Sequence, residues 1–211
     1  MKFTKFGHSC FLIEEGEAKI LVDPGSYSSG FESLTDLDAI LITHNHPDHM
    51  TPEIIQSLLV ANAGTVILAD EASAGDLAKA GVAAKAVHDG DREELGGLKI
   101  EVIGTEHAEI HPSLPRAKNV GYRISDSFFF PGDALTVPIG EIKVLALPLV
   151  APWSKVAETI DYLMAVKPNI AIPVHDAILA KSNPYAQILE RFAVAQNIEF
   201  RIVENGIMTE L

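Results

Sequence analysis

Three histidines and one aspartate stand within six consecutive positions of this 211-residue chain, directly after the apolar segment 39–42. Residues two apart on an extended chain point to the same side, so His44 and His46 can aim at one point. Asp48 and His49 lie in the turn that follows and can aim at a second point nearby. Imidazole and carboxylate are ligands that zinc and similar divalent ions prefer. Composition alone would produce this string in on the order of one in a thousand chains, so the segment predicts a metal site.

Four ligands are too few for two metal ions, and further candidate ligands follow later apolar segments of the chain. Each of them stands where a strand is expected to end: His107 and His111, Asp133, and His175 with its neighbour Asp176. Because strand ends along one sheet edge converge on one cleft, we expect these side chains to meet the first group. His107 and His111 follow the same expected strand, and both stay open as its ligand at this point.

The segments that must position these side chains alternate between short apolar strands and helix-like stretches. We expect strands at 3–6, 11–13, 18–23, 39–43, 65–69, 98–104, 120–125, 127–132, 142–149, 169–175 and 199–204. We expect helices at 52–60, 71–80, 156–165 and 185–196, with Thr51 and Ser154 as N-caps. Both halves start with strands and end with strand–helix units. This order predicts two packed sheets with helices over each outer face, an α/β (α+β) chain that forms a single domain over 1–211.

The composition of the chain limits which partners it can bind and in which cellular compartment it is expected. The net charge of −13 and the pI of about 4.9 argue against non-specific binding to nucleic acid or to an anionic membrane. Cys10 is the only cysteine, which excludes an intrachain disulfide, and it stands in an apolar strand where a core role is expected. No apolar stretch approaches the ~18 residues of a membrane helix, and the first 15 residues do not resemble a signal peptide. We expect a soluble cytoplasmic protein.

Four motifs occur in the order HNHPDH, TEH, PGDA and PVHD. With them the chain resembles the metallo-β-lactamase-fold hydrolases over nearly its whole length. The N-terminal GHSCFLIE further resembles the branch that contains L-ascorbate-6-phosphate lactonase and small metal-dependent hydrolases. The resemblance implies a four-layer αββα sandwich with a dinuclear site at one sheet edge. It implies these ligands: His44, His46 and His107 for the first metal, Asp48, His49 and His175 for the second, and Asp133 as the bridge.

The chemistry expected of such a site is hydrolysis by a metal-activated hydroxide. A divalent metal lowers the pKa of bound water to ~7, and the positive charge of two metals favours a small anionic ester, lactone or phosphodiester. Asp48 is expected to orient the hydroxide and take its proton. His8 is a second candidate catalytic residue, expected to line the site or contact substrate, with a purely structural hydrogen-bonding role as the alternative. Zinc is the expected metal, with manganese and iron as alternatives.

Several alternatives stay open at this stage. A nuclease would use the same metals. However, the chain is acidic, and it is too short for the additional RNA-binding domains of related nucleases. A redox member of the fold would favour glutamate where His46 stands. The loops 111–119 and 149–155 are expected to line the substrate-binding site. In these loops Arg116, Lys118 and Trp153 either contact the substrate or are ordinary surface residues. A homo-oligomer is compatible with the sequence, and His88 is expected in a solvated loop.

Overall fold

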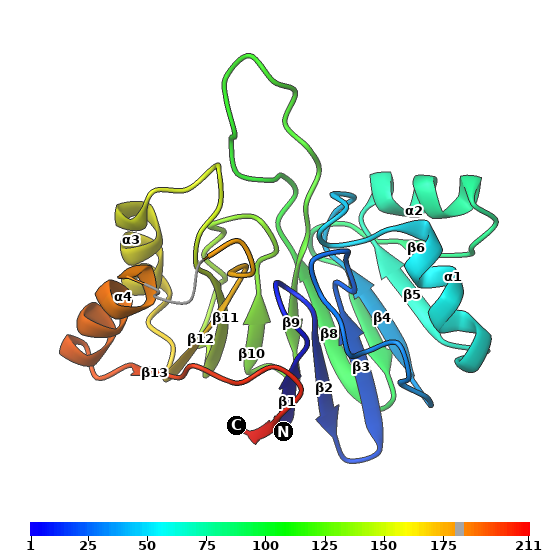
Figure 1. The fold of residues 1–211 in the computed structure, drawn as a ribbon, viewed down its shortest axis with the longest axis horizontal. Helices are drawn as coiled ribbons and strands as arrows, with labels where there is room; N and C mark the ends of the chain where they lie inside the picture. Colours follow the sequence, from blue (N-terminus) through cyan, green and yellow to red (C-terminus); the bar gives the residue numbers. More distant parts are fainter. Residues whose placement is uncertain (180–183) are drawn as a thin grey trace.

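Two seven-stranded sheets pack face to face in the computed structural model, which describes residues 1–179 and 184–211 (Figure 1). The first sheet has the order β14 (Met208–Glu210), β1 (Lys2–Lys5), β2 (Phe11–Glu15), β3 (Ala18–Val22), β4 (Ala39–Ile42), β5 (Val66–Ala69) and β6 (Lys85–Ala86). The second has the order β13 (Glu199–Phe200), β12 (Ile170–Val174), β11 (Val144–Pro148), β10 (Phe128–Phe130), β9 (Gly121–Ile124), β8 (Leu98–Ile103) and β7 (Arg92–Leu95).

Helices cover the outer face of each sheet. The first sheet carries α1 (Pro52–Ala61) and α2 (Glu71–Lys79), and the second carries α3 (Val156–Val166) and α4 (Pro184–Ala195) (Figure 1). α1 begins as expected, because the Thr51 side chain accepts a hydrogen bond from the backbone N–H of Ile54 and Pro52 needs no partner there. The layers therefore follow the order helix, sheet, sheet, helix, and the expected αββα sandwich is confirmed.

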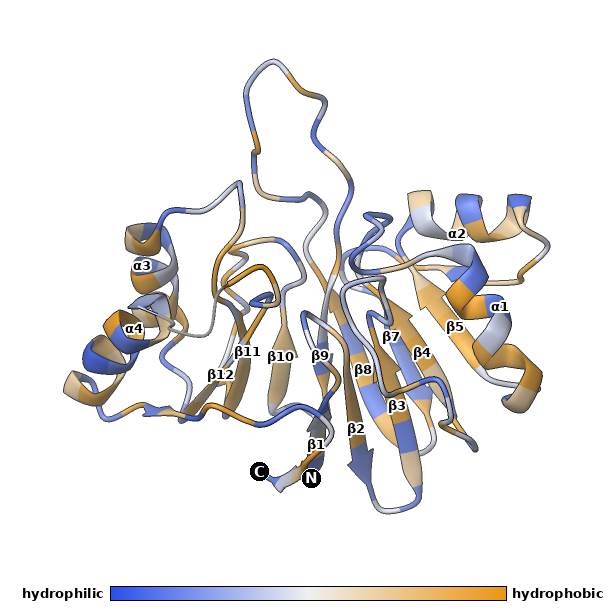
Figure 2. Cartoon of the chain, in the orientation of Figure 1, coloured by the Kyte–Doolittle hydropathy of each residue, from blue (hydrophilic) through white to orange (hydrophobic). Residues whose placement is uncertain are grey.

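Three separate apolar clusters hold the four layers together, and apolar residues are correspondingly dense in the strands (Figure 2). The cluster between the sheets contains Phe3 and Phe11, whose rings stack at 5.1 Å, and Phe128 from the opposite sheet. Burying each such side chain contributes about 1.5–3 kcal/mol. Tyr122 belongs to the same cluster and donates its hydroxyl to the carbonyl of Ile42 across the interface at 2.8 Å. Cys10 is fully buried in the cluster beneath α1 and α2, as its expected core role requires.

The structure differs from the sequence-based expectations mainly at the sheet margins. β6, β7 and β14 were not expected, because these short segments are largely exposed and carry little apolar signal. The expected strand at 199–204 is reduced to β13, and β14 forms the final strand by pairing with β1. Ser154 does not cap α3. The N-cap is Lys155, whose backbone N–H donates to Glu158 Oε2 at 2.9 Å.

Strand direction determines where the polar residues gather. In the first sheet β1, β3 and β4 run in the same direction, since β1 and β3 are both antiparallel to β2 and β3 is parallel to β4. In the second sheet β8, β10, β11 and β12 share one direction. The carboxyl ends of these strands carry the residues identified in the sequence. Among the described residues, no helix has the length and apolar character that a membrane span requires.

Candidate metal centre

The strand ends bring eight side chains into two adjacent groups, each able to hold a metal ion. Within each group, one candidate ligand atom per residue lies within 4.8 Å of the others. The first group consists of His44, His46, His107 and Asp133, and the second of His8, Asp48, His49 and His175. All seven expected ligands are present, and His8 joins the second group. Their roles as ligands stay a prediction that the geometry below supports.

Asp133 contacts both groups, as expected of a bridging carboxylate. Its Oδ1 lies 3.2 Å from His49 Nε2, and its Oδ2 lies 3.1 Å from His175 Nε2 and 3.3 Å from His107 Nε2. The side chain is only 4% exposed. His44 Nε2 is 4.0 Å from the same Oδ2 and 3.0 Å from His46 Nδ1. One buried carboxylate is therefore placed between imidazoles from two sheets.

Four buried atoms at this centre have no hydrogen-bond partner among the described residues. They are the Nε2 atoms of His49, His107 and His175 and the Oδ1 atom of Asp133. His49 Nε2 and Asp133 Oδ1 lie 3.2 Å apart without forming a hydrogen bond, and leaving a buried polar atom unpaired costs about 1–3 kcal/mol. Ligand atoms that converge on a cation would show this arrangement, because the metal replaces the missing partner. The donor set of imidazole and carboxylate fits zinc, manganese or iron.

The opposite ring nitrogens fix which nitrogen of each histidine faces the centre. His107 Nδ1 lies 2.6 Å from the carbonyl of Ala108, and His175 Nδ1 lies 2.7 Å from the carbonyl of Val150. A carbonyl only accepts, so in both rings Nδ1 carries the proton and Nε2 keeps its lone pair. Metal-binding histidines are generally oriented by such partners. Both rings are thus prepared as Nε2 ligands.

Asp23 orients His49 and, through Thr43, His44, and it is the residue that sequence reasoning missed. This fully buried carboxylate accepts hydrogen bonds from His49 Nδ1 at 2.7 Å, from the Thr43 hydroxyl at 2.7 Å and from the Thr43 N–H at 2.8 Å. Because the Thr43 hydroxyl donates to Asp23, it accepts from His44 Nδ1 at 3.0 Å. Asp23 therefore reaches one ligand in each group. It directly follows β3, so the strand-end rule that found the other residues could have found it.

The carboxylates make this centre attract positive charge. Burial lowers the pKa of His49, but Asp133 and Asp23 outweigh it and hold this pKa well above its ordinary value. Burial likewise opposes protonation of His175, yet Asp133 and Asp48 raise its pKa to about 9. Metal ligands must be deprotonated, so a bound divalent ion would take the place of these protons. The electrostatic potential at the centre therefore favours a bound cation.

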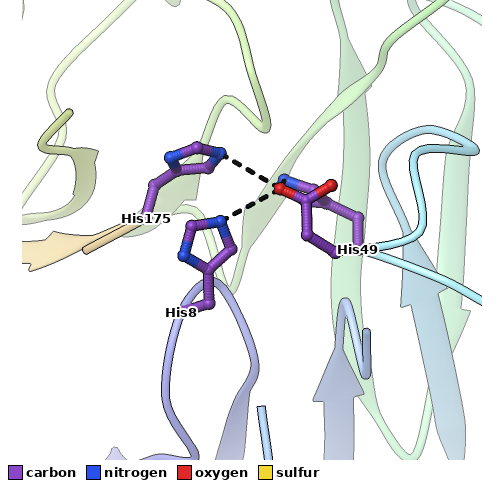
Figure 3. A group of neighbouring side chains, drawn as sticks. His8, His49 and His175 are labelled. Atoms are coloured by element: carbon purple, nitrogen blue, oxygen red, sulfur yellow. Dashed lines mark hydrogen bonds and ion pairs between the residues drawn. The ribbon is translucent and has the colours of Figure 1, made fainter. Parts of the chain in front are cut away.

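His8 differs from the other histidines of the second group, because its ring is turned the other way. The backbone N–H of Ala177 donates to His8 Nδ1 at 3.3 Å, which requires a lone pair on that nitrogen. The neutral ring then carries its proton on Nε2 and donates it to Asp48 Oδ2 at 3.1 Å. Burial lowers the pKa of His8, which favours this neutral form. Figure 3 shows His8 and His175 directed at one carboxylate oxygen. His8 is thus placed as a donor to Asp48.

Local backbone geometry holds the second group in place. His175 adopts a left-handed conformation with φ of 57°, and its N–H donates to the carbonyl of His8 at 2.7 Å. The neighbouring Asp176 pairs with the buried Lys5, whose Nζ lies 2.7 Å from Oδ1. Asp176 therefore ties β12 to β1 and is not a ligand.

A Cβ atom on Gly25 would lie 2.0 Å from the carbonyl oxygen of Asp48, so only glycine allows this turn.

Of the loop residues expected around the substrate, Trp153 contacts a candidate metal ligand, and the others belong to neither ligand group. His111 is exposed in the long β8–β9 loop (Figure 1), where its Nδ1 contacts the Ser113 hydroxyl, and it belongs to neither ligand group. Arg116 in the same loop is bonded to Glu106 and Glu109. Other placements are as follows: Lys118 lines a small cavity with Asp70 and His88, His88 is exposed, and Trp153 donates to Asp133.

This fold and this cluster of histidines and carboxylates define a metal-dependent hydrolase of the metallo-β-lactamase fold. Residues 2–175 match the family described as the β-lactamase superfamily domain, and the chain belongs to that superfamily.

Two curated relatives extend the match along most of the chain. Protein Rv0786c of Mycobacterium tuberculosis is 45% identical over 185 residues, covering 85% of this chain and 86% of that protein. The UPF0173 metal-dependent hydrolase MJ1163 of Methanocaldococcus jannaschii is 26% identical over 191 residues, covering 82% of each chain. The sequence resemblance to metal-dependent hydrolases is therefore confirmed.

Two solved structures confirm the fold. A candidate metal-dependent hydrolase from Parabacteroides distasonis superposes with a TM-score of 0.77 at 24% identity, covering 96% of this chain and 92% of that one. CmlA, a diiron β-hydroxylase from Streptomyces venezuelae, superposes with a TM-score of 0.77 at 16% identity, covering all of this chain and 54% of that one. At these identities the likeness concerns the fold alone.

Proposed function

We propose that this enzyme uses two divalent metal ions, with zinc as the expected metal, to hydrolyse a small ester, lactone or phosphodiester. The observation that carries the proposal is the pair of adjacent ligand groups that share Asp133 and contain four buried ligand atoms without partners. A single tetrahedral zinc would leave about half of these ligands unused. When bound, the metals lower the pKa of water to about 7 and polarise the substrate.

Asp48 is the residue best placed to take a proton from the attacking water. Its side chain is 22% exposed, against 4% for Asp133, so it faces the open side of the centre. Its contacts with His8, His49 and His175 are all made by Oδ2, which leaves Oδ1 for water. Burial alone would raise the pKa of Asp48, but His175 and His8 hold it below its usual range. Asp48 is therefore ionised and able to accept.

A small cavity lies beside His46 and His107. Its volume is about 60 Å³, and the β8–β9 loop lines it with Ile110, Leu114 and Arg116. The guanidinium of Arg116 is already bonded to two glutamates, so it does not offer a free cation. An anionic substrate would then be held mainly by the positive charge of the metals.

We expect purified protein to bind about two divalent ions per chain, because the ligands form two groups. Elemental analysis after incubation with zinc or manganese measures the stoichiometry. His107→Ala should lose about one ion, whereas His111→Ala is the matched control and should keep both. A wild-type stoichiometry that stays at zero contradicts the proposal, and loss of an ion from His111→Ala would assign the ligand role to His111 instead.

We expect turnover of small lactones or of bis-p-nitrophenyl phosphate, and none of long RNA. The reason is that the proposed metals make a cationic centre, whereas the rest of the acidic protein would repel a long polyanion such as RNA. A panel with lactones, the phosphodiester and tRNA measures this, and His46→Ala controls for contaminating activity. Efficient tRNA cleavage without turnover of the small esters would favour a nuclease and contradict the proposed substrate class.

A further inference from the structure

Trp153 is the only tryptophan of the chain, and its indole N–H donates to Asp133. The Nε1 atom lies 2.9 Å from Asp133 Oδ2, while Oδ1 of the same carboxylate has no partner among the described residues. The two oxygens of the shared carboxylate are therefore not equivalent. One is held by a neutral donor, and the other is left free on the side of His49.

The loop that carries Trp153, between β11 and α3, makes a second contact with the centre. The carbonyl of Val150 accepts from His175 Nδ1 at 2.7 Å and so fixes the tautomer of this candidate ligand. The indole also lies edge-on to the rings of His107 and His175, with centroids 5.7 Å and 6.2 Å away. A single loop thus contacts a ligand from each group as well as the carboxylate between them.

We propose that Trp153 is a positioning residue that holds the Asp133 carboxylate in one orientation and thereby raises the metal affinity of the centre. This inference rests on the proposed metal centre and adds a determinant of its affinity. Rotation about the terminal carboxylate torsion is soft, with broad minima, so an unheld Asp133 would sample orientations that are poor for binding. The N–H bond selects one of them before metal arrives. Partners of this kind change metal affinity by about 10–100-fold.

Packing alone is the competing explanation for Trp153, and one substitution separates the two roles. Trp153→Phe keeps an aromatic ring beside His107 and His175 but removes the N–H donor. We expect its affinity for zinc to fall by about tenfold or more. Competition with a chromophoric chelator measures this affinity without any substrate. The matched control is Tyr162→Phe, which removes the hydroxyl donor to the Thr136 carbonyl at 3.0 Å and contacts no candidate ligand.

A second replacement keeps the inference testable if the smaller ring disturbs the loop. Because Trp153 is the only tryptophan, a tryptophan-auxotrophic host can replace it with β-(3-benzothienyl)alanine, which has sulfur in place of the indole N–H. Circular dichroism establishes that each protein is folded. Lower zinc affinity of this folded analogue, with Tyr162→Phe unchanged, supports the positioning role.

The outcomes also separate this inference from the proposed function. If the wild-type protein and both replacements bind two zinc ions with equal affinity, Trp153 has no positioning role, and the proposed function stands. If the wild-type protein itself binds no metal, the proposed metal centre fails and the inference fails with it. Wild-type fluorescence gives an independent readout, since the sole indole contacts Asp133 and should change its emission when zinc binds.

Discussion

Asp48→Asn is expected to lower kcat by at least about a hundredfold while the protein stays folded. The amide keeps the size of the side chain but loses the charge and the capacity to accept a proton at Oδ1. General-base contributions run at about 10²–10⁴-fold. The side chain is partly exposed at 22%, so water can solvate the new amide group. Steady-state kinetics on the small-ester substrate of the panel measures the effect.

Metal content distinguishes the role of Asp48 from that of a first-group ligand. Asp48→Asn should weaken binding of the second metal without abolishing it, because His49 and His175 remain beside Asp133. Binding of the first metal should not change, because Asp48 does not belong to the first group. His46→Ala should instead empty the first group. Measuring metal content and turnover on both variants together tests the assignment. Near-normal turnover with both metals retained in Asp48→Asn would show that Asp48 is neither a ligand nor the proton acceptor.

Asp23→Asn is expected to weaken zinc binding by about a hundredfold, the upper end for a residue that acts through ligands. Asp23 receives three hydrogen bonds from His49 and Thr43 on two carboxylate oxygens. An amide offers one oxygen, and its NH₂ group would oppose at least one of these donors. The carboxylate charge that holds His49 is lost in either amide orientation, and an NH₂ group in the place of Oδ2 also removes the acceptor that fixes the His49 tautomer. In that orientation the Thr43 hydroxyl also loses its acceptor, and the His44 tautomer is no longer fixed through this hydroxyl.

Stability has to be separated from metal affinity in this variant, since an unpaired buried donor costs about 1–3 kcal/mol. Asp70→Asn is the matched control. Asp70 is also buried and accepts the N–H groups of Ala72 and Ser73 at the start of α2, but it contacts no candidate ligand. Both variants should lower Tm, and only Asp23→Asn should lower the affinity measured by chelator competition. Equal zinc affinity for wild type and Asp23→Asn would exclude the orienting role.

The sequence predicted the strands that flank the centre better than the margins of the sheets. β4, β10 and β12 are apolar runs followed within three residues by a polar candidate ligand, a local pattern with a strong signal. β14 has no such pattern, because its stability comes from pairing with the distant β1. Ser154 was wrongly expected to cap α3 because serine is a common cap, whereas the side chain of Glu158 supplies the partner.

By itself, the sequence determined the class of the protein and the residue types of the centre. The spacing of His44, His46, Asp48 and His49 is local, and short-range chain geometry is enough to aim them at two points. Only the tertiary structure decided which nitrogen of each ring faces the centre, because that depends on carbonyls and carboxylates from other segments. It turned His8 toward Asp48 through the Ala177 N–H, 169 residues away, and Asp133 toward Trp153. Hydrogen bonds between segments distant in the chain leave no periodic signal, so folding alone brings such partners together.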